Sequence, residues 1–164
     1  MNIEQKLNKE ISTIITFSLT DPPLKRGRKT KKELTYSEFF SDKMMIISLI
    51  RIGVPYSLFE LIKAVTPFSE GDWASFLSIS NKSLVRYKQE SRSFKPIQSE
   101  KILEMAEVAQ AGTETFGDME RFKLWLDTPN FSLGNLKPIE LLRDSYGKEM
   151  VIAELTRIDH GILV

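Results

Sequence analysis

Phe76-Leu-Ser-Ile-Ser-Asn-Lys-Ser-Leu-Val-Arg-Tyr-Lys88 is the stretch that decides the fold, because it has the pattern of the turn and second helix of a helix-turn-helix. The apolar residues in it and just before it have the spacing of two short helices packed together: Trp73, Phe76, Leu77, Ile79 and Leu84. Ser78 and Ser80 suit a tight turn, and Ser80 is placed to cap the helix that follows. We therefore predict a helix over about 81–89.

The polar residues of this predicted helix and of the loop after it suit contacts with base edges and phosphates. The candidate DNA-binding residues are Asn81, Lys82, Ser83, Arg86, Lys88 and Arg92. The alternative is a pair of core-packed helices with a solvated basic face, since short motifs often match by chance. Residues 79–101 contain six basic and two acidic side chains. This local excess of positive charge favours DNA binding, with an affinity that falls steeply with salt.

Composition excludes several kinds of chemistry. The 164 residues include no cysteine and one histidine, His160, so the sequence predicts no disulfide, thiolate nucleophile or metal site. No nucleophile–base set accompanies that histidine, so we expect no catalytic residues, no cofactor and no enzymatic activity. No apolar run approaches the ~20 residues that cross a bilayer, and the first residues do not resemble a signal peptide. We therefore expect a cytoplasmic protein that does not contact membranes.

Apolar residues recur at helical spacing along the whole chain, and no segment has the alternation of a strand. We expect an all-α fold with helices over about 3–17, 41–52, 55–65, 73–77, 81–89, 99–115, 118–126, 138–142 and 148–160. Ser41, Ser99 and Asp118 are the expected starts of three of them. Pro and Gly residues separate the helices.

The chain divides by composition and pattern into three parts. Residues 1–40 form an amphipathic helix and a basic arm, 41–112 the helix-turn-helix region, and 113–164 a small C-terminal helical region. Six basic residues lie within 25–32, whereas the net charge of the whole chain is only +1. Such an arm is either a solvated linker or a phosphate-tracking element. The first helix either docks on its own domain or contacts a second copy or a partner.

Two regions together resemble the Xre/MbcA/ParS-type antitoxins of bacterial toxin–antitoxin systems. One is the helix-turn-helix, with Glu100-Lys-Ile-Leu-Glu-Met-Ala-Glu-Val-Ala109 and Phe116-Gly-Asp118 after it. The other contains Trp125-Leu-Asp-Thr-Pro-Asn130, Gly134 with Lys137-Pro-Ile-Glu-Leu-Leu142, and Arg157-Ile-Asp-His-Gly161. The resemblance covers roughly 43–164. It departs from the family pattern by one extra residue between Gly134 and Pro138, and by Lys82-Ser83 where the family commonly has Arg-Thr.

The resemblance implies an Xre-like helix-turn-helix domain followed by a small helical toxin-binding domain. The partner toxin would have a RES-type fold and would either degrade NAD⁺ or use it to modify a target. The antitoxin would block this toxin with its C-terminal region, bind operator DNA of its own operon, and form a homodimer and a larger toxin–antitoxin complex. The residues that the family motifs nominate for toxin binding are Trp125, Pro129, Asn130, Leu141, Arg157, His160 and Gly161.

Several of these residues also have a purely structural interpretation. Trp125 has the spacing of a core aromatic residue, so we expect it to support the binding surface from below. Pro129 and Asn130 suit a helix stop followed by a turn. His160 suits a helix end, where a cation meets the negative end of the helix dipole. Two other functions also stay open: a DNA-binding regulator without a toxin, and a protein-interaction module that no longer binds DNA.

Overall fold

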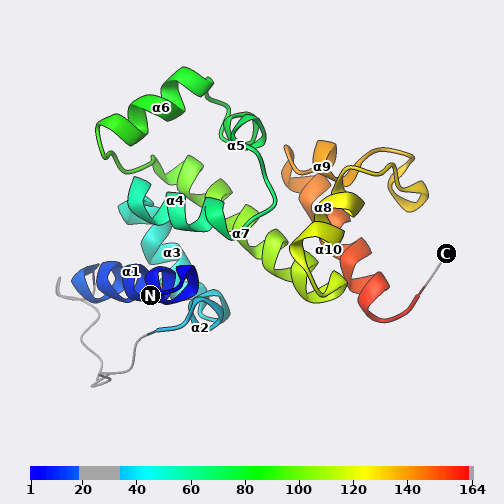
Figure 1. Cartoon of the computed structure of the whole chain (residues 1–164), viewed down its shortest axis with the longest axis horizontal. Coiled ribbons are helices and arrows are strands. Elements are labelled where there is room, and N and C mark those ends of the chain that lie inside the picture. The colour runs from blue at the N-terminus through cyan, green and yellow to red at the C-terminus, as the bar shows by residue number, and fades with distance from the viewer. Residues whose placement is uncertain (19–33, 163–164) are drawn as a thin grey trace. The chain divides into compact units, whose positions relative to one another are not determined.

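The computed structural model describes residues 1–18 and 34–162, and within these ranges the regular secondary structure is helical (Figure 1). Two isolated antiparallel bridges, Pro55–Ser93 and Asn130–Leu136, are the exceptions there. The all-α fold predicted from the sequence is confirmed. The basic arm over 25–32 lies outside the described residues. No helix in the described ranges is long and apolar enough to span a membrane.

The helices are α1 (Ile3–Ser18), α2 (Tyr36–Ser41), α3 (Lys43–Ile52), α4 (Tyr56–Ala64), α5 (Glu70–Phe76), α6 (Asn81–Gln89), α7 (Pro96–Phe116), α8 (Met119–Leu126), α9 (Pro138–Leu141) and α10 (Ser145–Asp159). A short 3₁₀ turn, η1 (Phe131–Leu133), follows α8. α6 has the predicted bounds, and α1, α4 and α8 differ from the predicted ranges by one residue or two at either end.

In the N-terminal half, one helix start was predicted wrongly and one helix was missed. Ser41 is the last residue of α2, a helix that the sequence analysis missed, and α3 begins after its own cap, Asp42. α2 is nucleated by a capping box, in which Thr35 Oγ1 accepts from the Glu38 N–H while the Glu38 carboxylate accepts from the Thr35 N–H.

Three more starts come earlier than predicted, because helix-starting residues precede them. α5 begins at Glu70, after its cap Ser69, and not at Trp73. α7 begins at Pro96, since proline needs no N–H partner in a first turn. Ser99 is therefore not a cap. It lies fully buried inside α7, where its hydroxyl accepts from the Val54 N–H (2.8 Å) and donates to the Phe94 carbonyl (3.2 Å). α10 begins at Ser145, one residue after Asp144, and not near Lys148.

The described residues form two compact units. Unit one contains Met1–Val65 and Val85–Leu103, and unit two contains Thr66–Leu84 and Glu104–Val164. α6 and α7 each contribute residues to both units. The three-part division predicted from the sequence stays a prediction.

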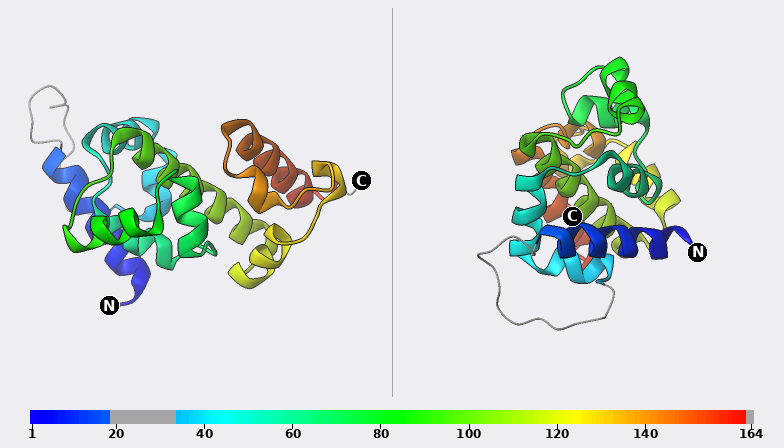
Figure 2. Two further views of the ribbon diagram at one scale, coloured as in Figure 1. Left: turned by 90° about the horizontal axis from the view of Figure 1, so that it is seen from above. Right: turned by 90° about the vertical axis from the view of Figure 1, so that its left-hand side faces the viewer.

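In unit one, α1 packs against α2, α3 and α4 (Figures 1 and 2). Its buried face is apolar and includes Leu7 and Ile11, each 1% exposed. A cluster of aromatic rings forms another part of this core, with Tyr56, Phe59 and Tyr87 arranged around Phe94. Burial of large rings of this kind is among the strongest stabilising contributions in a small domain.

In unit two, α8, α9, α10 and η1 pack around a core that includes Phe122, Leu142, Val151 and Leu155. Gly147 allows α10 to approach the backbone of α9, because a Cβ there would lie 2.0 Å from the Leu141 carbonyl oxygen.

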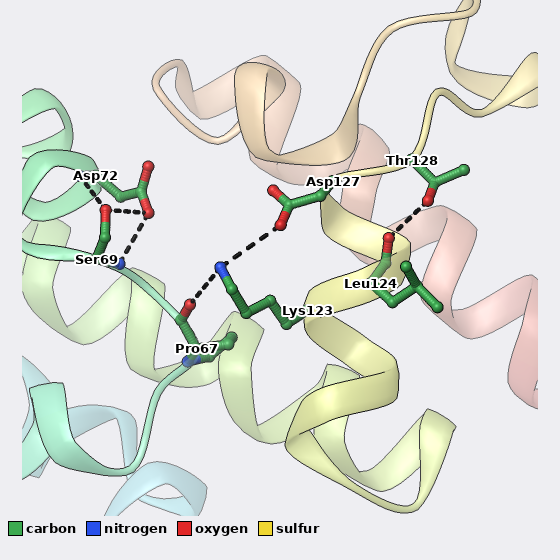
Figure 3. A network of polar contacts seen from close by, with 7 residues as sticks. All are labelled: Pro67, Ser69, Asp72, Lys123, Leu124, Asp127 and Thr128. Carbon is green, nitrogen blue, oxygen red and sulfur yellow. Dashed lines mark hydrogen bonds and ion pairs between the residues drawn. The ribbon is translucent and has the colours of Figure 1, made fainter.

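A polar network joins α8 to the segment that precedes α5 (Figure 3). Lys123 Nζ donates to the Pro67 carbonyl at 3.5 Å and pairs with the Asp127 carboxylate, also at 3.5 Å. Nearby, Ser69 and Asp72 form the capping box that starts α5. The network lies within unit two, which contains residues 66–84 together with the C-terminal helices.

Candidate functional site

α5, the turn after it and α6 have the connectivity of a helix-turn-helix. The Ser78 backbone is left-handed (φ 52°), which lets the Ile79 N–H donate to the Ala74 carbonyl at 3.0 Å and closes the end of α5. Ser80 Oγ accepts from the Ser83 N–H at 3.0 Å, so the predicted cap of α6 is confirmed.

The apolar residues that were predicted to hold these two helices are inside unit two. Trp73, Phe76, Leu77 and Leu84 are each 5% exposed or less, and Ile79 is half-buried. Phe68 adds edge-to-face contacts with Trp73 and Phe76. Four of the five apolar positions predicted to hold the two helices together are therefore buried, and Ile79 is buried in part.

Five of the six predicted DNA-binding residues are exposed: Asn81, Lys82, Arg86, Lys88 and Arg92. Ser83 is half-buried, with its hydroxyl 3.0 Å from that of Ser80. Arg92 follows α6 and is turned back toward it, because Ser91 is left-handed (φ 48°) and the Arg92 N–H donates to the Tyr87 carbonyl at 3.1 Å. The Arg92 guanidinium lies over the Tyr87 ring, 5.4 Å from its centroid.

Three of these cations have carboxylate partners, which the sequence analysis did not predict. Arg86 Nε lies 3.8 Å from Glu90 Oε1, and Arg92 Nη1 lies 3.3 Å from Glu90 Oε2. Lys88 Nζ lies 3.4 Å from Glu60 Oε1 on α4. The first pair could have been found from the i,i+4 spacing of Arg86 and Glu90. The pair between Lys88 and α4 depends on the tertiary fold.

The predicted toxin-binding residues lie in three places within unit two. Trp125 on α8 is half-buried, 5.5 Å from the Phe116 ring centroid and 6.1 Å from that of Phe122, which agrees with a supporting role. Pro129 is exposed after it. Asn130 organises the next turn, since its Oδ1 accepts from the Ser132 N–H at 2.8 Å. Leu141, on α9, is half-buried.

Arg157, His160 and Gly161 lie at the end of α10. His160 is its C-terminal cap, with Nδ1 2.7 Å from the Thr156 carbonyl oxygen, and Gly161 adopts the left-handed conformation that closes the helix. Arg157 Nη2 pairs with the buried carboxylate of Glu154. Arg157 Nε is also buried and has no hydrogen-bond partner within the described part of the chain.

α10 has a second apolar side that the sequence analysis missed. Its inward side buries Gly147, Val151 and Leu155. On an adjoining side of the helix, Tyr146 is 84% exposed and Met150 is 46% exposed. Ala153, Arg157 and His160 continue this row at spacings of three and four, which places all five side chains along one face of the helix. We call this row the α10 stripe. Tyr146 escaped notice because the predicted helix began after it.

The chain is similar to several known proteins. Residues 111–161, which include the α10 stripe, match the model of the antitoxin Xre/MbcA/ParS C-terminal toxin-binding domain. Two curated proteins described as antitoxin Xre are each 25% identical to the chain. The one from Yersinia enterocolitica aligns over 72% of this chain and 80% of its own length, and the one from Photorhabdus laumondii over 71% and 79%.

A chain in the crystal structure of the M. tuberculosis MbcT–MbcA toxin–antitoxin complex has a similar fold. The TM-score is 0.53 at 20% sequence identity, over 65% of this chain and 97% of that one. The sequence matches show that residues 111–161 resemble a toxin-binding domain and that the chain is similar to proteins described as antitoxins, and the structural match shows a shared fold. The resemblance to the Xre/MbcA/ParS-type antitoxins that was inferred from the sequence is therefore confirmed, with the family match confined to residues 111–161.

Proposed function

We propose that this antitoxin binds and blocks a RES-type, NAD⁺-directed toxin through its C-terminal region, and represses its own operon through the helix formed by Asn81–Gln89. In this proposal it acts as a homodimer and joins a larger complex with the toxin. The RES fold and the NAD⁺ chemistry rest on the resemblance to the Xre/MbcA/ParS family.

The observation that supports toxin binding most directly is the α10 stripe. Tyr, Met and Arg are enriched at the centres of protein interfaces, and a helix with anchors at such spacings is a common ligand of grooves. Tyr146 is 84% exposed, although another side of the same helix is buried in the core. A partner that covers this tyrosine would bury a large aromatic ring. The stripe also lies inside the segment that matches a toxin-binding domain.

Operator binding is supported by the exposed donors on α6. Lys82 and Arg86 are four residues apart on this helix and both are exposed, which suits one face of a recognition helix. A dimer is part of the proposal because helix-turn-helix proteins place two recognition helices about one DNA turn apart.

Co-expression with the adjacent open reading frame tests the toxin-binding half. Cells should survive with the full chain and die with a chain that lacks residues 140–164, which include all of α10. Equal survival with both chains would contradict C-terminal blocking. Equal death with both would contradict the assignment of that reading frame product as the partner toxin.

A gel shift with DNA from upstream of the gene, over a series of salt concentrations, tests the DNA-binding half. We expect a shift that weakens steeply with salt, and loss of at least tenfold in affinity for Lys82→Ala/Arg86→Ala. Circular dichroism checks that the variant keeps its helices. Unchanged binding by the folded double variant would contradict the assignment of α6 as the recognition helix.

A further inference from the structure

Glu90 joins two of the candidate DNA-binding side chains. One of its carboxylate oxygens faces Arg86 at 3.8 Å, and the other faces Arg92 at 3.3 Å. The two arginines approach it from opposite directions along the chain, one from the last full turn of α6 and the other from the reversal after it. A single carboxylate therefore contacts two guanidinium groups.

Arg92 has a second contact besides its ion pair with Glu90. The Arg92 guanidinium lies over the ring of Tyr87, which stacks on Phe94 with a centroid distance of 4.4 Å and an interplanar angle of 12°. The Tyr87 hydroxyl also donates a hydrogen bond to Gln98 Oε1 at 3.1 Å, which holds the outer end of the ring. Phe94, on which the Tyr87 ring stacks, is fully buried, so the ring under Arg92 rests on the core of unit one.

Carboxylates also reduce the positive charge at this end of α6. Arg86, Lys88 and Arg92 supply three positive charges, and Glu90 with Glu60 supplies two negative ones within 4 Å of them. Binding to DNA of arbitrary sequence depends almost entirely on phosphate contacts by such cations. A carboxylate that stays beside them repels the phosphates and weakens this binding.

We propose that Glu90 is a positioning residue that raises the DNA specificity of this antitoxin, by holding Arg86 and Arg92 in one geometry while it opposes their binding to phosphates of any sequence. The proposal rests on the proposed DNA-binding function. In a complex with the operator, correctly placed guanidinium groups gain bidentate contacts that offset the presence of the carboxylate. On other DNA no such contacts are available, so the repulsion is not offset.

Three variants of the full-length chain separate charge from positioning. Glu90→Gln removes the negative charge and keeps the side-chain length. Glu90→Asp keeps the charge and is too short to reach both arginines. Glu100→Gln is the matched control, because Glu100 is an exposed carboxylate on α7 with the same change of charge and no ion pair recorded in the described residues. Each is titrated with upstream DNA and with a random duplex of equal length and base composition, at several salt concentrations.

We expect Glu90→Gln to bind the random duplex about threefold more tightly than the wild type, with a steeper salt dependence, and to gain nothing on upstream DNA. Glu90→Asp should bind upstream DNA more weakly and leave random binding unchanged. Glu100→Gln should change both affinities by the same factor. The proposal would be overturned if both Glu90 variants had the same ratio of upstream to random affinity as the wild type. DNA binding itself would still stand. If the wild type binds neither duplex, the DNA-binding function and the role of Glu90 both fail.

Discussion

α6 and α10 both present an exposed side to solvent, and the chemistry of the two sides is opposite. The exposed side of α6 and its C-terminal turn is cationic, and three of its cations are paired with carboxylates. The exposed side of α10 begins with the large apolar side chains Tyr146 and Met150. A cationic surface suits a polyanion, and an exposed apolar row suits a protein groove. The comparison shows that one chain presents two exposed surfaces of different chemistry.

The largest effect on the α10 surface is expected from a substitution that separates α10 from α9. In Gly147→Ala the new Cβ would lie 2.0 Å from the Leu141 carbonyl oxygen, an atom of the backbone that cannot rotate away. We expect a loss of about 3 kcal/mol in the free energy of unfolding, measured by urea denaturation, and a loss of toxin neutralisation.

Gly71→Ala is the matched control, since this glycine lies within α5 and its Cβ would meet only Ser69 Oγ at 3.7 Å. It should stabilise the protein by about 0.5–1 kcal/mol, because alanine favours helix more than glycine does. Equal stability of the two glycine variants would contradict the close packing of α9 and α10.

The α6 surface depends on buried polar contacts that support Tyr87 and Arg92. Ser99→Ala would leave the Val54 N–H, which is fully buried, without its partner. We expect a loss of about 2 kcal/mol in unfolding free energy. Ser93→Ala changes an exposed serine nearby and should stay within about 0.5 kcal/mol of the wild type. If both alanine variants unfold at the same urea concentration as the wild type, the hydrogen bonds of the Ser99 hydroxyl do not stabilise the fold.

The cap of α6 is the next test of that surface. Ser80→Ala removes the acceptor for the Ser83 N–H and should cost about 1 kcal/mol. Ser80→Asp keeps an acceptor and should restore most of that stability. Thermal melts followed by circular dichroism distinguish the two substitutions, and identical melting temperatures would contradict the capping role.

The smallest expected effect lies in the turn between α5 and α6. Ser78 is held at φ 52°, which costs less for glycine than for serine, so Ser78→Gly should stabilise the protein by about 0.5 kcal/mol. Ser75→Gly, three residues earlier inside α5, should instead destabilise it by about 0.5 kcal/mol or slightly more. Destabilisation by both glycines in urea melts would show that the left-handed turn is not strained.

Local signals were sufficient to predict α6, because its cap, its apolar residues and its polar side all lie within a dozen consecutive residues. The capping box of α2 and the proline at the start of α7 are equally local signals, but both were missed. The helix starts were predicted instead from the apolar spacing of the neighbouring segments. Ser99 shows a different limit. A serine in a plausible capping position is buried because two distant backbone groups, those of Val54 and Phe94, need its hydroxyl.

The candidate surfaces were only partly predictable for the same reason. Exposure of the α6 donors follows from helical periodicity alone. The pairing of Lys88 with Glu60 requires α4 to lie beside α6, and no spacing along the chain encodes that contact. The α10 stripe depends on which side of the helix the core of unit two covers, so the exposed positions of Tyr146 and Met150 needed the structure.

The central claim, that two separate surfaces bind two different partners, is tested by one crossed measurement. Tyr146→Ala/Met150→Ala and Lys82→Ala/Arg86→Ala are each titrated with purified toxin and with upstream DNA, with Ile97→Ala as the control because Ile97 is 77% exposed and lies outside the matched domain. We predict that the first variant loses about 100-fold in toxin affinity and keeps its DNA affinity, and that the second does the reverse. Equal losses toward both partners in either variant, with both variants folded, would contradict the account.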